Sequence, residues 1–208
     1  MDRNLECVIF DIGGVLINQD LPSLARGLSV RTGQDAERVR SLFGGDVVRD
    51  VETGRVSSES HFSRTIAPRL PGISYEDWIS AWTNNYSLNQ EAWSLLEEAR
   101  ERGHVVGILS NLSEFHKIAI ERKFPHFFRA AHRSFLSYEL GLHKPAPEIY
   151  LAVSQQLEIT PARCLFLDDI EENVLGAQAA GMAGMRFDDS RIAEIRAALG
   201  WQATPGAP

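Results

Sequence analysis

The chain has 208 residues, of which 44% are hydrophobic and 24% charged, and it carries a net charge of −7. A chain of this length and composition buries a proper core and forms one domain with an insertion, or two small domains. The acidic balance gives no basis for nucleic acid or an anionic membrane as a partner, because both favour basic surfaces.

Apolar runs that end in polar residues alternate with amphipathic stretches along most of the chain, which is typical of a parallel sheet covered by helices. The first apolar run, Val8–Phe10, leads directly to Asp11. Gly103 and Pro125 each follow an amphipathic stretch, where they would end a helix. The expected strands are residues 8–10, 104–109, 130–136, 163–167 and 185–187, and the expected helices are residues 89–102, 114–123, 147–157, 171–180 and 191–199.

Residues 18–87 show helical periodicity without a convincing buried strand, which predicts a small all-helical insertion, or cap. Its expected helices are residues 21–32, 35–43, 57–66 and 74–82, with glycines between several of them. The predicted fold class is therefore α/β, with a Rossmann-like parallel sheet and an inserted cap. Residues 1–17 and 88–200 would form the core, residues 18–87 the cap, and residues 201–208 a tail without periodicity.

The sequence predicts a cytoplasmic protein. No apolar stretch approaches the ~20 residues that cross a bilayer, and the N-terminus MDRNLE lacks the pattern of a secretory signal. Cys7 and Cys164 each precede an apolar run, so we expect two reduced core residues and no disulfide or metal site. Nothing in the sequence defines an oligomeric state.

Polar residues of the kinds used in phosphoryl transfer follow the expected strands, and parallel α/β sheets bind ligands just outside the carboxyl ends of their strands. A nucleophilic carboxylate, a hydroxyl and an amide for phosphate oxygens, a lysine and paired carboxylates for a hard cation make up such a site. Each alone has an ordinary structural role, but their joint occurrence favours chemistry. In chain order they are Asp11, Gly13-Gly14 with N–H groups for an anion, Ser110-Asn111, Lys144 and Asp168-Asp169.

The segments FDIGGVL, ILSN, GLHKPAPEIY and LFLDDIEENVLGA resemble the motifs of the haloacid dehalogenase (HAD) superfamily, over essentially the whole chain. Among its members the chain is most similar to sugar-phosphatase-like and epoxide-hydrolase-N-domain-like phosphatases. The resemblance implies a Mg²⁺-dependent hydrolase that acts on a small phosphorylated metabolite and has a cap between the first two motifs. It implies that Asp11 is the nucleophile that forms an aspartyl-phosphate, and that Ser110 and Lys144 are also catalytic. The implied phosphate-binding residues are Gly13, Gly14, Ser110, Asn111 and Lys144. The implied Mg²⁺ site consists of Asp11, the carbonyl of Gly13, Asp168 and Asp169, with Asn173 in a supporting position.

Gly13 departs from this family pattern, because the phosphatases usually carry a second aspartate there as general acid and base. General acid–base catalysis contributes about 10² to 10⁴ in rate, so we expect good leaving groups, as in anomeric sugar, acyl or aryl phosphates. Asp20, Glu52 and His61 are candidate proton donors, although each also has an ordinary structural interpretation.

Two alternatives remain open. Dehalogenases of the family also lack the second aspartate, but Asp168 and Asp169 would repel their carboxylate substrates. The second alternative is a catalytically weak or inactive module that binds phosphate or Mg²⁺ in regulation, and Gly13 is the feature that motivates it.

Substrate choice is expected to depend on the cap. Arg49, Arg55, Trp78, Trp82 and Tyr86 are candidates for lining a substrate pocket there. Trp78 and Trp82 lie four residues apart on an expected helix, a spacing that also suits core packing. The sequence therefore does not name the substrate.

Overall fold

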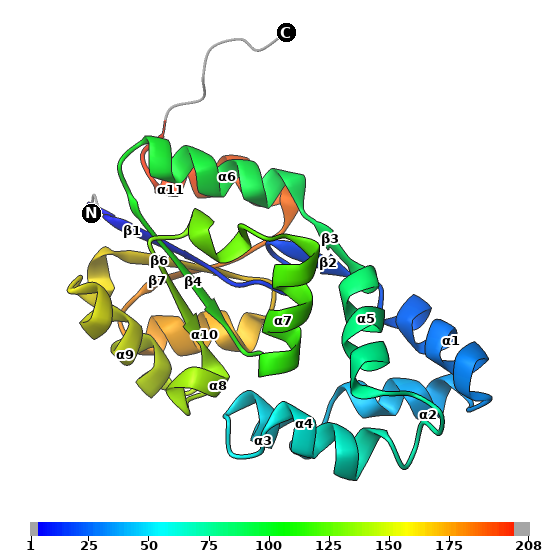
Figure 1. Cartoon of the computed structure of the whole chain (residues 1–208). Coiled ribbons are helices and arrows are strands. Elements are labelled where there is room, and N and C mark those ends of the chain that lie inside the picture. Colours follow the sequence, from blue (N-terminus) through cyan, green and yellow to red (C-terminus); the bar gives the residue numbers. More distant parts are fainter. Residues whose placement is uncertain (1–3, 202–208) are drawn as a thin grey trace, which may run out of the picture.

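The computed structural model describes residues 4–201 and contains a five-stranded parallel sheet with helices on both faces, next to a second group of helices (Figure 1). This confirms the predicted α/β fold class. All neighbouring strands of the sheet run parallel. Their spatial order is β5 (Arg133–Leu136), β4 (Val105–Ser110), β1 (Cys7–Phe10), β6 (Cys164–Asp168) and β7 (Ala183–Arg186).

Two hydrophobic clusters hold the helices against the two faces of the sheet. Strand β1 is buried throughout because its side chains point alternately into both clusters: Val8 and Phe10 join one, Cys7 and Ile9 the other. Helices α6 (Gln90–Glu101), α7 (Glu114–Lys123) and α11 (Ile192–Ala198) contribute to the first cluster, and α9 (Pro147–Leu157) and α10 (Glu171–Ala179) to the second.

The two cysteines lie in register on neighbouring strands, with Cys7 of β1 beside Cys164 of β6. Both are buried, which confirms the prediction of two core residues, and neither forms a disulfide among the described residues. Their small side chains fill space between the sheet and the helices of the second cluster.

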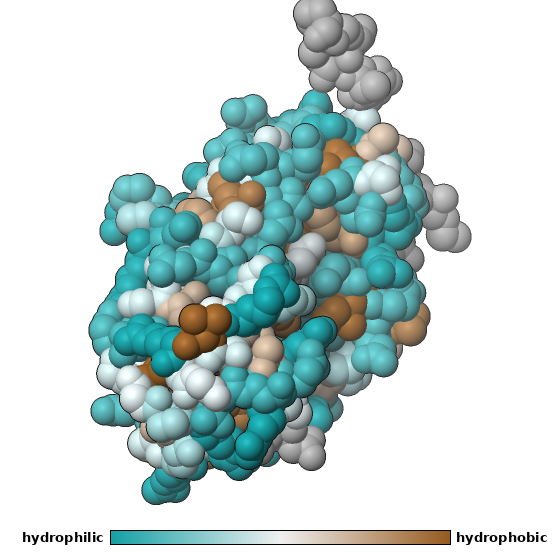
Figure 2. Space-filling view, turned by 90° about the vertical axis from the view of Figure 1, so that its right-hand side faces the viewer, coloured by the Kyte–Doolittle hydropathy of each residue, from teal (hydrophilic) through white to brown (hydrophobic). Residues whose placement is uncertain are grey.

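The second group of helices contains the five that lie between β2 and β3 in the chain. Its members are α1 (Leu21–Thr32), α2 (Ala36–Arg40), α3 (Asp46–Glu52), α4 (Ser58–His61), which continues as a π-helical segment (Phe62–Ile66), and α5 (Tyr75–Asn85). Helix α3 was not among the expected helices. In Figure 2 the surface on this side is mostly hydrophilic, with small separate hydrophobic patches.

The expectation of a segment without strands is wrong at its two ends. Strands β2 (Ile17–Gln19) and β3 (Tyr86–Leu88) pair antiparallel and form a ribbon where the helices join the sheet. Three-residue strands are too short to show a period, and in each of these only the first residue is buried. The ribbon spans the predicted boundaries at residues 17/18 and 87/88, so the division into core and cap remains a proposal.

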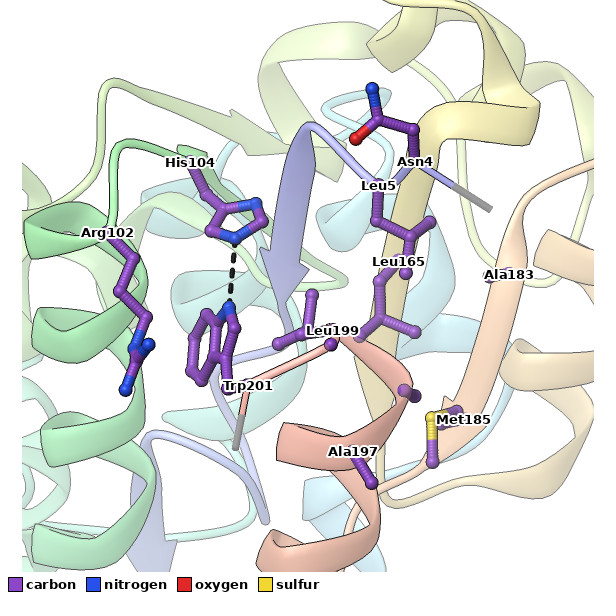
Figure 3. Close-up of a pocket in the computed structure, with 12 residues that line it drawn as sticks. Asn4, Leu5, Arg102, His104, Leu165, Ala183, Met185, Ala197, Leu199 and Trp201 are labelled. Atoms are coloured by element: carbon purple, nitrogen blue, oxygen red, sulfur yellow. Dashed lines mark hydrogen bonds between the residues drawn. The ribbon is translucent and has the colours of Figure 1, made fainter. Parts of the chain in front are cut away.

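Trp201, the first residue of the predicted tail, packs on the core (Figure 3). Its Nε1 donates to His104 Nε2 at 3.1 Å, and the Arg102 guanidinium lies 5.0 Å from its ring centroid. These residues line a hollow of about 1030 Å³ near the amino ends of the strands, and no carboxylate lines it among the described residues. The rest of the predicted tail, residues 202–208, lies outside the described residues.

The connection from α7 to β5 also differs from the expected strand 130–136. A 3-10 turn (Phe127–Ala130) occupies its beginning, and β5 starts only at Arg133. Within residues 4–201, no helix combines the length and the apolar character needed to cross a membrane.

Candidate active site

The carboxyl ends of the three central strands β4, β1 and β6 meet at one edge of the sheet and bring Ser110, Asp11 and Asp168 together. Lys144 enters from the segment before α9, and it is the only Lys or Arg that lines the cavity at this edge among the described residues. Its Nζ lies 2.9 Å from Asp11 Oδ1 and 2.6 Å from Asp168 Oδ2. The structure thus assembles a buried ammonium between two carboxylates.

The Lys144 ammonium is held mainly from the side of Asp168. It donates to Asp168 Oδ2 at 2.6 Å and to the carbonyl oxygen of Leu109 at 3.2 Å. Burial alone would lower the pKa of Lys144, but the charges of Asp11 and Asp168 raise it above its ordinary value. Asp11 Oδ1, although 2.9 Å from Nζ, receives no well-directed hydrogen bond. The lysine therefore supplies charge and leaves this oxygen of Asp11 available.

Asp11 is almost fully buried, and burial raises its pKa to about 6. The charge of Lys144 opposes this rise, whereas the charge of Asp168 adds to it. The nearby Ser110 side chain also lowers the pKa of Asp11 and so favours the ionised form. A further cation beside Asp11 would favour the carboxylate, because an opposite charge at short range stabilises the charged form.

The paired aspartates at the end of β6 differ in what they contact. Asp168 Oδ1 accepts from the Ile170 N–H at 2.9 Å, and Asn173 Nδ2 lies 3.1 Å from both of its oxygens. With Lys144 as a further donor, the hydrogen-bonding capacity of Asp168 is largely used. Its geometry suits the positioning of Lys144, and Asn173 in turn supports Asp168.

Asp169, in contrast, has a buried Oδ1 without a hydrogen-bond partner. Burial raises the pKa of Asp169, and the charge of Asp168 raises it further. A Cβ on Gly14, whose φ is +75°, would lie 2.3 Å from Asp169 Oδ2. Gly14 is therefore the residue that lets the Asp169 carboxylate approach the turn after β1.

These acidic residues fit a hard divalent cation. Single carboxylate oxygens of Asp11, Asp168 and Asp169 all lie within 4.8 Å of one another. Asp169 Oδ1 is buried without a hydrogen-bond partner, a state that favours a compensating ligand, whereas Asp11 Oδ1 has only the Lys144 ammonium beside it. Carboxylate oxygens are the donors that Mg²⁺ prefers.

Asn111 clamps the peptide group of Lys144. Its Oδ1 accepts from the Lys144 N–H at 2.9 Å, and its Nδ2 donates to the Lys144 carbonyl oxygen at 3.0 Å. The side-chain amide that was expected to bind phosphate therefore holds the lysine in place here. Any contact of the Asn111 side chain with a phosphoryl group would compete with this clamp.

His143 is a site residue that sequence reasoning missed. Its Nδ1 lies 3.1 Å from Asn111 Nδ2, and its Nε2 lies 2.9 Å from Glu52 Oε2. Glu52 is the last residue of α3, and its carbonyl oxygen accepts a hydrogen bond from Ser137 Oγ. Helix α3 is thus attached to the segment that carries Lys144. The only signal in the sequence was that His143 precedes Lys144.

The three candidate proton donors lie in different places. Glu52 lines the cavity but is paired with His143. His61 lines a separate small cavity between α3, α5 and α7. Asp20 is exposed and accepts a hydrogen bond from the Ser23 N–H at the start of α1, and it does not line the cavity.

Gln19 occupies the space next to Gly13. A Cβ on Gly13 would lie 3.0 Å from Gln19 Nε2, and Gln19 lines the cavity. A side chain at position 13 would therefore extend toward the carboxamide of Gln19, which belongs to β2. No signal in the sequence indicated this contact, because β2 was not predicted.

The cavity itself has a volume of about 640 Å³. Trp82 and Tyr86 line it as expected, whereas Arg49, Arg55 and Trp78 do not. Arg55 pairs with Asp50 on the surface, at 3.3 Å. Arg49 is exposed, and Trp78 is buried in the hydrophobic core. The prediction of arginines in this pocket is therefore wrong.

The chain belongs to the haloacid dehalogenase-like hydrolase family, whose model matches residues 5–181. It is 26% identical to the sesquiterpene phosphatase astK of Aspergillus oryzae over 91% of this chain and 93% of that protein. It is 29% identical to the phosphatase MT3486 of Mycobacterium tuberculosis, over 90% of this chain and 89% of that one. The chain is accordingly an enzyme, a phosphatase of this family.

A solved structure of the HAD family enzyme bt-2542 of Bacteroides thetaiotaomicron, in complex with magnesium and inorganic phosphate, is similar with a TM-score of 0.78. The two chains are 26% identical, and the match covers 89% of this chain and 95% of that chain. The family fold thus extends over both the sheet and most of the inserted helices.

Proposed function

We propose that this phosphatase is a Mg²⁺-dependent phosphomonoesterase that works through an aspartyl-phosphate on Asp11. Its substrates would be small phosphorylated metabolites with good leaving groups, among which anomeric sugar, acyl and aryl phosphates are preferred. The observation that carries the proposal is the buried Lys144 ammonium 2.9 Å from an Asp11 oxygen that has no other partner. This arrangement combines a nucleophile with charge for a phosphoryl group.

In the first step, an Asp11 oxygen attacks phosphorus, and the bond from phosphorus to the leaving oxygen breaks. Lys144, Ser110 and the backbone N–H groups of Gly13 and Gly14 would stabilise the charge on the phosphoryl oxygens. Water then attacks the aspartyl-phosphate, releases inorganic phosphate and restores the carboxylate. Asn111 acts in both steps by holding the Lys144 peptide group.

Asp11, Asp169 and the Gly13 carbonyl would hold Mg²⁺, with Asp168 beside them. The bound ion would neutralise charge on the phosphoryl group. The buried Asp169 Oδ1, which has no hydrogen-bond partner, and the carboxylates of Asp11 and Asp168 close to it support this assignment. The magnesium and phosphate in the similar bt-2542 structure also support it.

Gly13 supports the preference for good leaving groups. With glycine there, the chain has no carboxylic acid two residues after the nucleophile, and the nearest side chain is the Gln19 carboxamide. A carboxamide can donate a hydrogen bond to a leaving oxygen but cannot give it a proton. Leaving groups that depart as stable anions need no such proton.

Trapping the covalent intermediate tests the proposal directly. We expect acetyl phosphate and Mg²⁺, quenched in acid within one turnover, to leave a phosphoryl group on the peptide that contains Asp11. Mass spectrometry would locate it, and Asp11→Asn would abolish it. Turnover without any label on this peptide would refute the nucleophile. A protein that binds phosphate but shows neither label nor turnover would be the regulatory module.

A further inference from the structure

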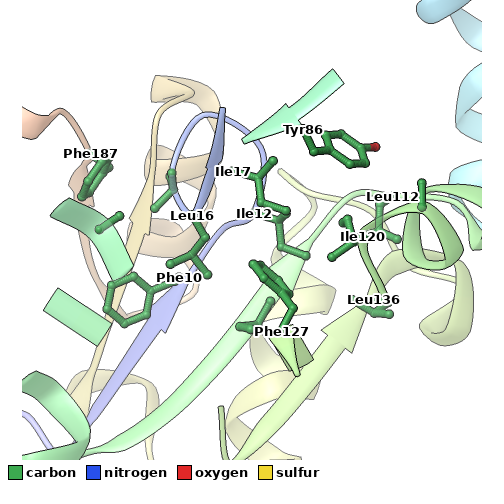
Figure 4. Close-up of a cluster of buried hydrophobic side chains, with 14 of the residues drawn as sticks. Phe10, Ile12, Leu16, Ile17, Tyr86, Leu112, Ile120, Phe127, Leu136 and Phe187 are labelled. Atoms are coloured by element: carbon green, nitrogen blue, oxygen red, sulfur yellow. The ribbon is translucent and has the colours of Figure 1, made fainter. Parts of the chain in front are cut away.

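The cavity above Asp11 has two sides of different character. On the sheet side, it is lined by the charged residues of the candidate active site. On the other side it has an apolar wall, which we define as Phe43, Trp82, Tyr86, Leu112 and Ile120. Five different segments supply this wall, from the turn after α2 to helix α7. In Figure 4, Tyr86, Leu112 and Ile120 lie on one side of Ile12, the residue after Asp11.

The wall is a continuous packed surface. The Phe43 and Trp82 rings lie 5.4 Å apart in an edge-on arrangement, and the Trp82 and Tyr86 rings lie 6.1 Å apart. Trp82, Tyr86, Leu112 and Ile120 are each at most 4% exposed, so they are fixed by the hydrophobic core behind them. A rigid apolar surface of this kind suits an apolar ligand body, since binding orders few side chains.

The same side of the cavity lacks positive charge. Among the lining residues that the structure describes, Lys144 is the only Lys or Arg, and its ammonium already faces Asp11 and Asp168. His116, which lines the cavity next to the wall, stays neutral at physiological pH because burial lowers its pKa to about 3. A second phosphate or a carboxylate on the substrate would find no cation here.

Polar groups next to the wall are largely paired with each other, and Nε1 of Trp82 is a buried donor without a hydrogen-bond partner. His143 and Glu52 line the cavity but are bonded to each other. Nδ1 of His116 faces Ser113 Oγ at 3.0 Å. A ring with many hydroxyls placed against Phe43 and Trp82 would replace only part of the hydrogen bonds that it makes with water, since Trp82 offers a single N–H donor, and the loss of the others is unfavourable.

From this lining we propose that the substrate carries its single phosphate on an apolar body, a hydrocarbon chain or an aromatic ring, that lies against the apolar wall. The inference rests on the proposed function, because it places the phosphate at Asp11 and Lys144. It narrows the proposed substrates from monophosphates with any good leaving group to monophosphates that also carry an apolar body. The cavity of about 640 Å³ lies within the ~300–1,000 Å³ typical of small-molecule sites.

Alkylphosphonates test this inference without any turnover, since their C–P bond replaces the bond that the enzyme would cleave. We would measure ethyl-, butyl-, hexyl- and octylphosphonate binding to the intact protein with Mg²⁺ by calorimetry. Each methylene that becomes buried is expected to tighten binding roughly fourfold, and ethyl to octyl at least ~100-fold. 3,4-Dihydroxybutylphosphonate, which has the length of the butyl compound, should bind more weakly than butylphosphonate. Equal affinities along the series, or tighter binding of the dihydroxy compound, would overturn the inference.

Phe43→Ala locates the effect on the wall. This change should lower the ratio of octyl to ethyl affinity about tenfold and leave ethylphosphonate binding unchanged. The matched control is Phe128→Ala, which removes a partly buried ring that does not line the cavity, and it should leave the ratio unchanged. A ratio that both variants reduce equally would count against the wall. If Phe43→Ala fails to fold, the series on the unchanged protein still decides.

Phosphate release from acetyl phosphate separates the two proposals, because acetyl phosphate has a good leaving group and almost no apolar body. Release of phosphate, together with phosphonate affinities that do not change with chain length, would support the proposed function and exclude the apolar substrate class. Binding that tightens with chain length, without release from any monophosphate, would remove the proposed function and leave an apolar phosphonate-binding cavity.

Discussion

The two sides of the cavity are built in different ways. The sheet side is assembled mainly from residues that directly follow strands, and Lys144 and Asp168 there are held by several hydrogen bonds. The apolar wall is assembled from three stretches that are far apart in the chain, around residue 43, residues 82–86 and residues 112–120. In our proposals the first side determines which bond is broken, and the second determines which molecules present that bond. The proposed catalytic residues are thus marked by local sequence signals, whereas the proposed substrate wall arises only in the tertiary structure.

The largest expected effect comes from removing the proposed nucleophile on the sheet side. Asp11→Asn should lower kcat by at least ~10⁴. The folded state should be as stable as before or more stable, because burial raises the pKa of Asp11 to about 6 and its charge at pH 7 is unfavourable. Steady-state phosphate release and thermal unfolding measure the two effects. Asp20→Asn, at the exposed N-cap of α1, is the matched control. Full activity in Asp11→Asn would contradict the assignment.

Lys144→Met breaks the charge cluster on the same side. It leaves Asp11 and Asp168 buried without their cation, so we expect a loss of about 3–5 kcal/mol in the free energy of unfolding as well as of activity. Denaturant unfolding would measure the first. Lys117→Met, which removes a partly exposed lysine near Glu121, should change stability by less than ~1 kcal/mol. Equal effects of the two changes would show that Lys144 is not part of a buried cluster.

Gly13→Asp tests whether the site lacks a general acid for the leaving group. The φ of Gly13 is not in the left-handed region, and its Cβ would meet only the flexible end of Gln19, at 3.0 Å. We therefore expect the variant to fold and to speed hydrolysis of alkyl phosphates by up to ~10²-fold, with a smaller gain for aryl phosphates. Gly44→Asp, at an open surface position, is the control. Equal gains for both leaving groups would argue against a missing general acid.

The smallest effect concerns His116, behind the apolar wall. Burial lowers its pKa to about 3, whereas an unfolded histidine titrates near ~6.5. Below pH 6.5 the unfolded chain therefore binds a proton that the folded chain does not. The free energy of unfolding consequently decreases as the pH is lowered, by up to ~2 kcal/mol at pH 5. Denaturant unfolding at pH 7 and pH 5 should show a smaller fall in His116→Gln than in the unchanged protein or in His126→Gln, whose histidine is exposed. Identical falls in all three would contradict this burial.

The sheet and the chemistry side were predictable because their signals are local. Continuous apolar runs identified the central strands, and the polar residues that follow them identified Asp11, Ser110 and Asp168. Chain order together with the family pattern placed Lys144 at the same edge. The structure brings these residues together, and their catalytic roles remain a proposal.

The remaining features depend on contacts between distant or short segments. Strands β2 and β3 have three residues each, too few to show a period, and the contact of Gln19 with Gly13 depends on β2. Glu52 and His143 are 91 positions apart. Arg49 and Arg55 look suited to a phosphate in the sequence, but only the packing of α3 shows that they lie away from the cavity.

Phosphate release from aryl, acyl, anomeric-sugar and alkyl phosphates, with and without Mg²⁺, tests the central claim most directly. We expect release that requires Mg²⁺, is abolished by Asp11→Asn, and is faster for aryl and acyl phosphates than for short alkyl phosphates. No release from any of these substrates, or release that persists in Asp11→Asn or after removal of Mg²⁺, would contradict a Mg²⁺-dependent phosphatase that works through Asp11.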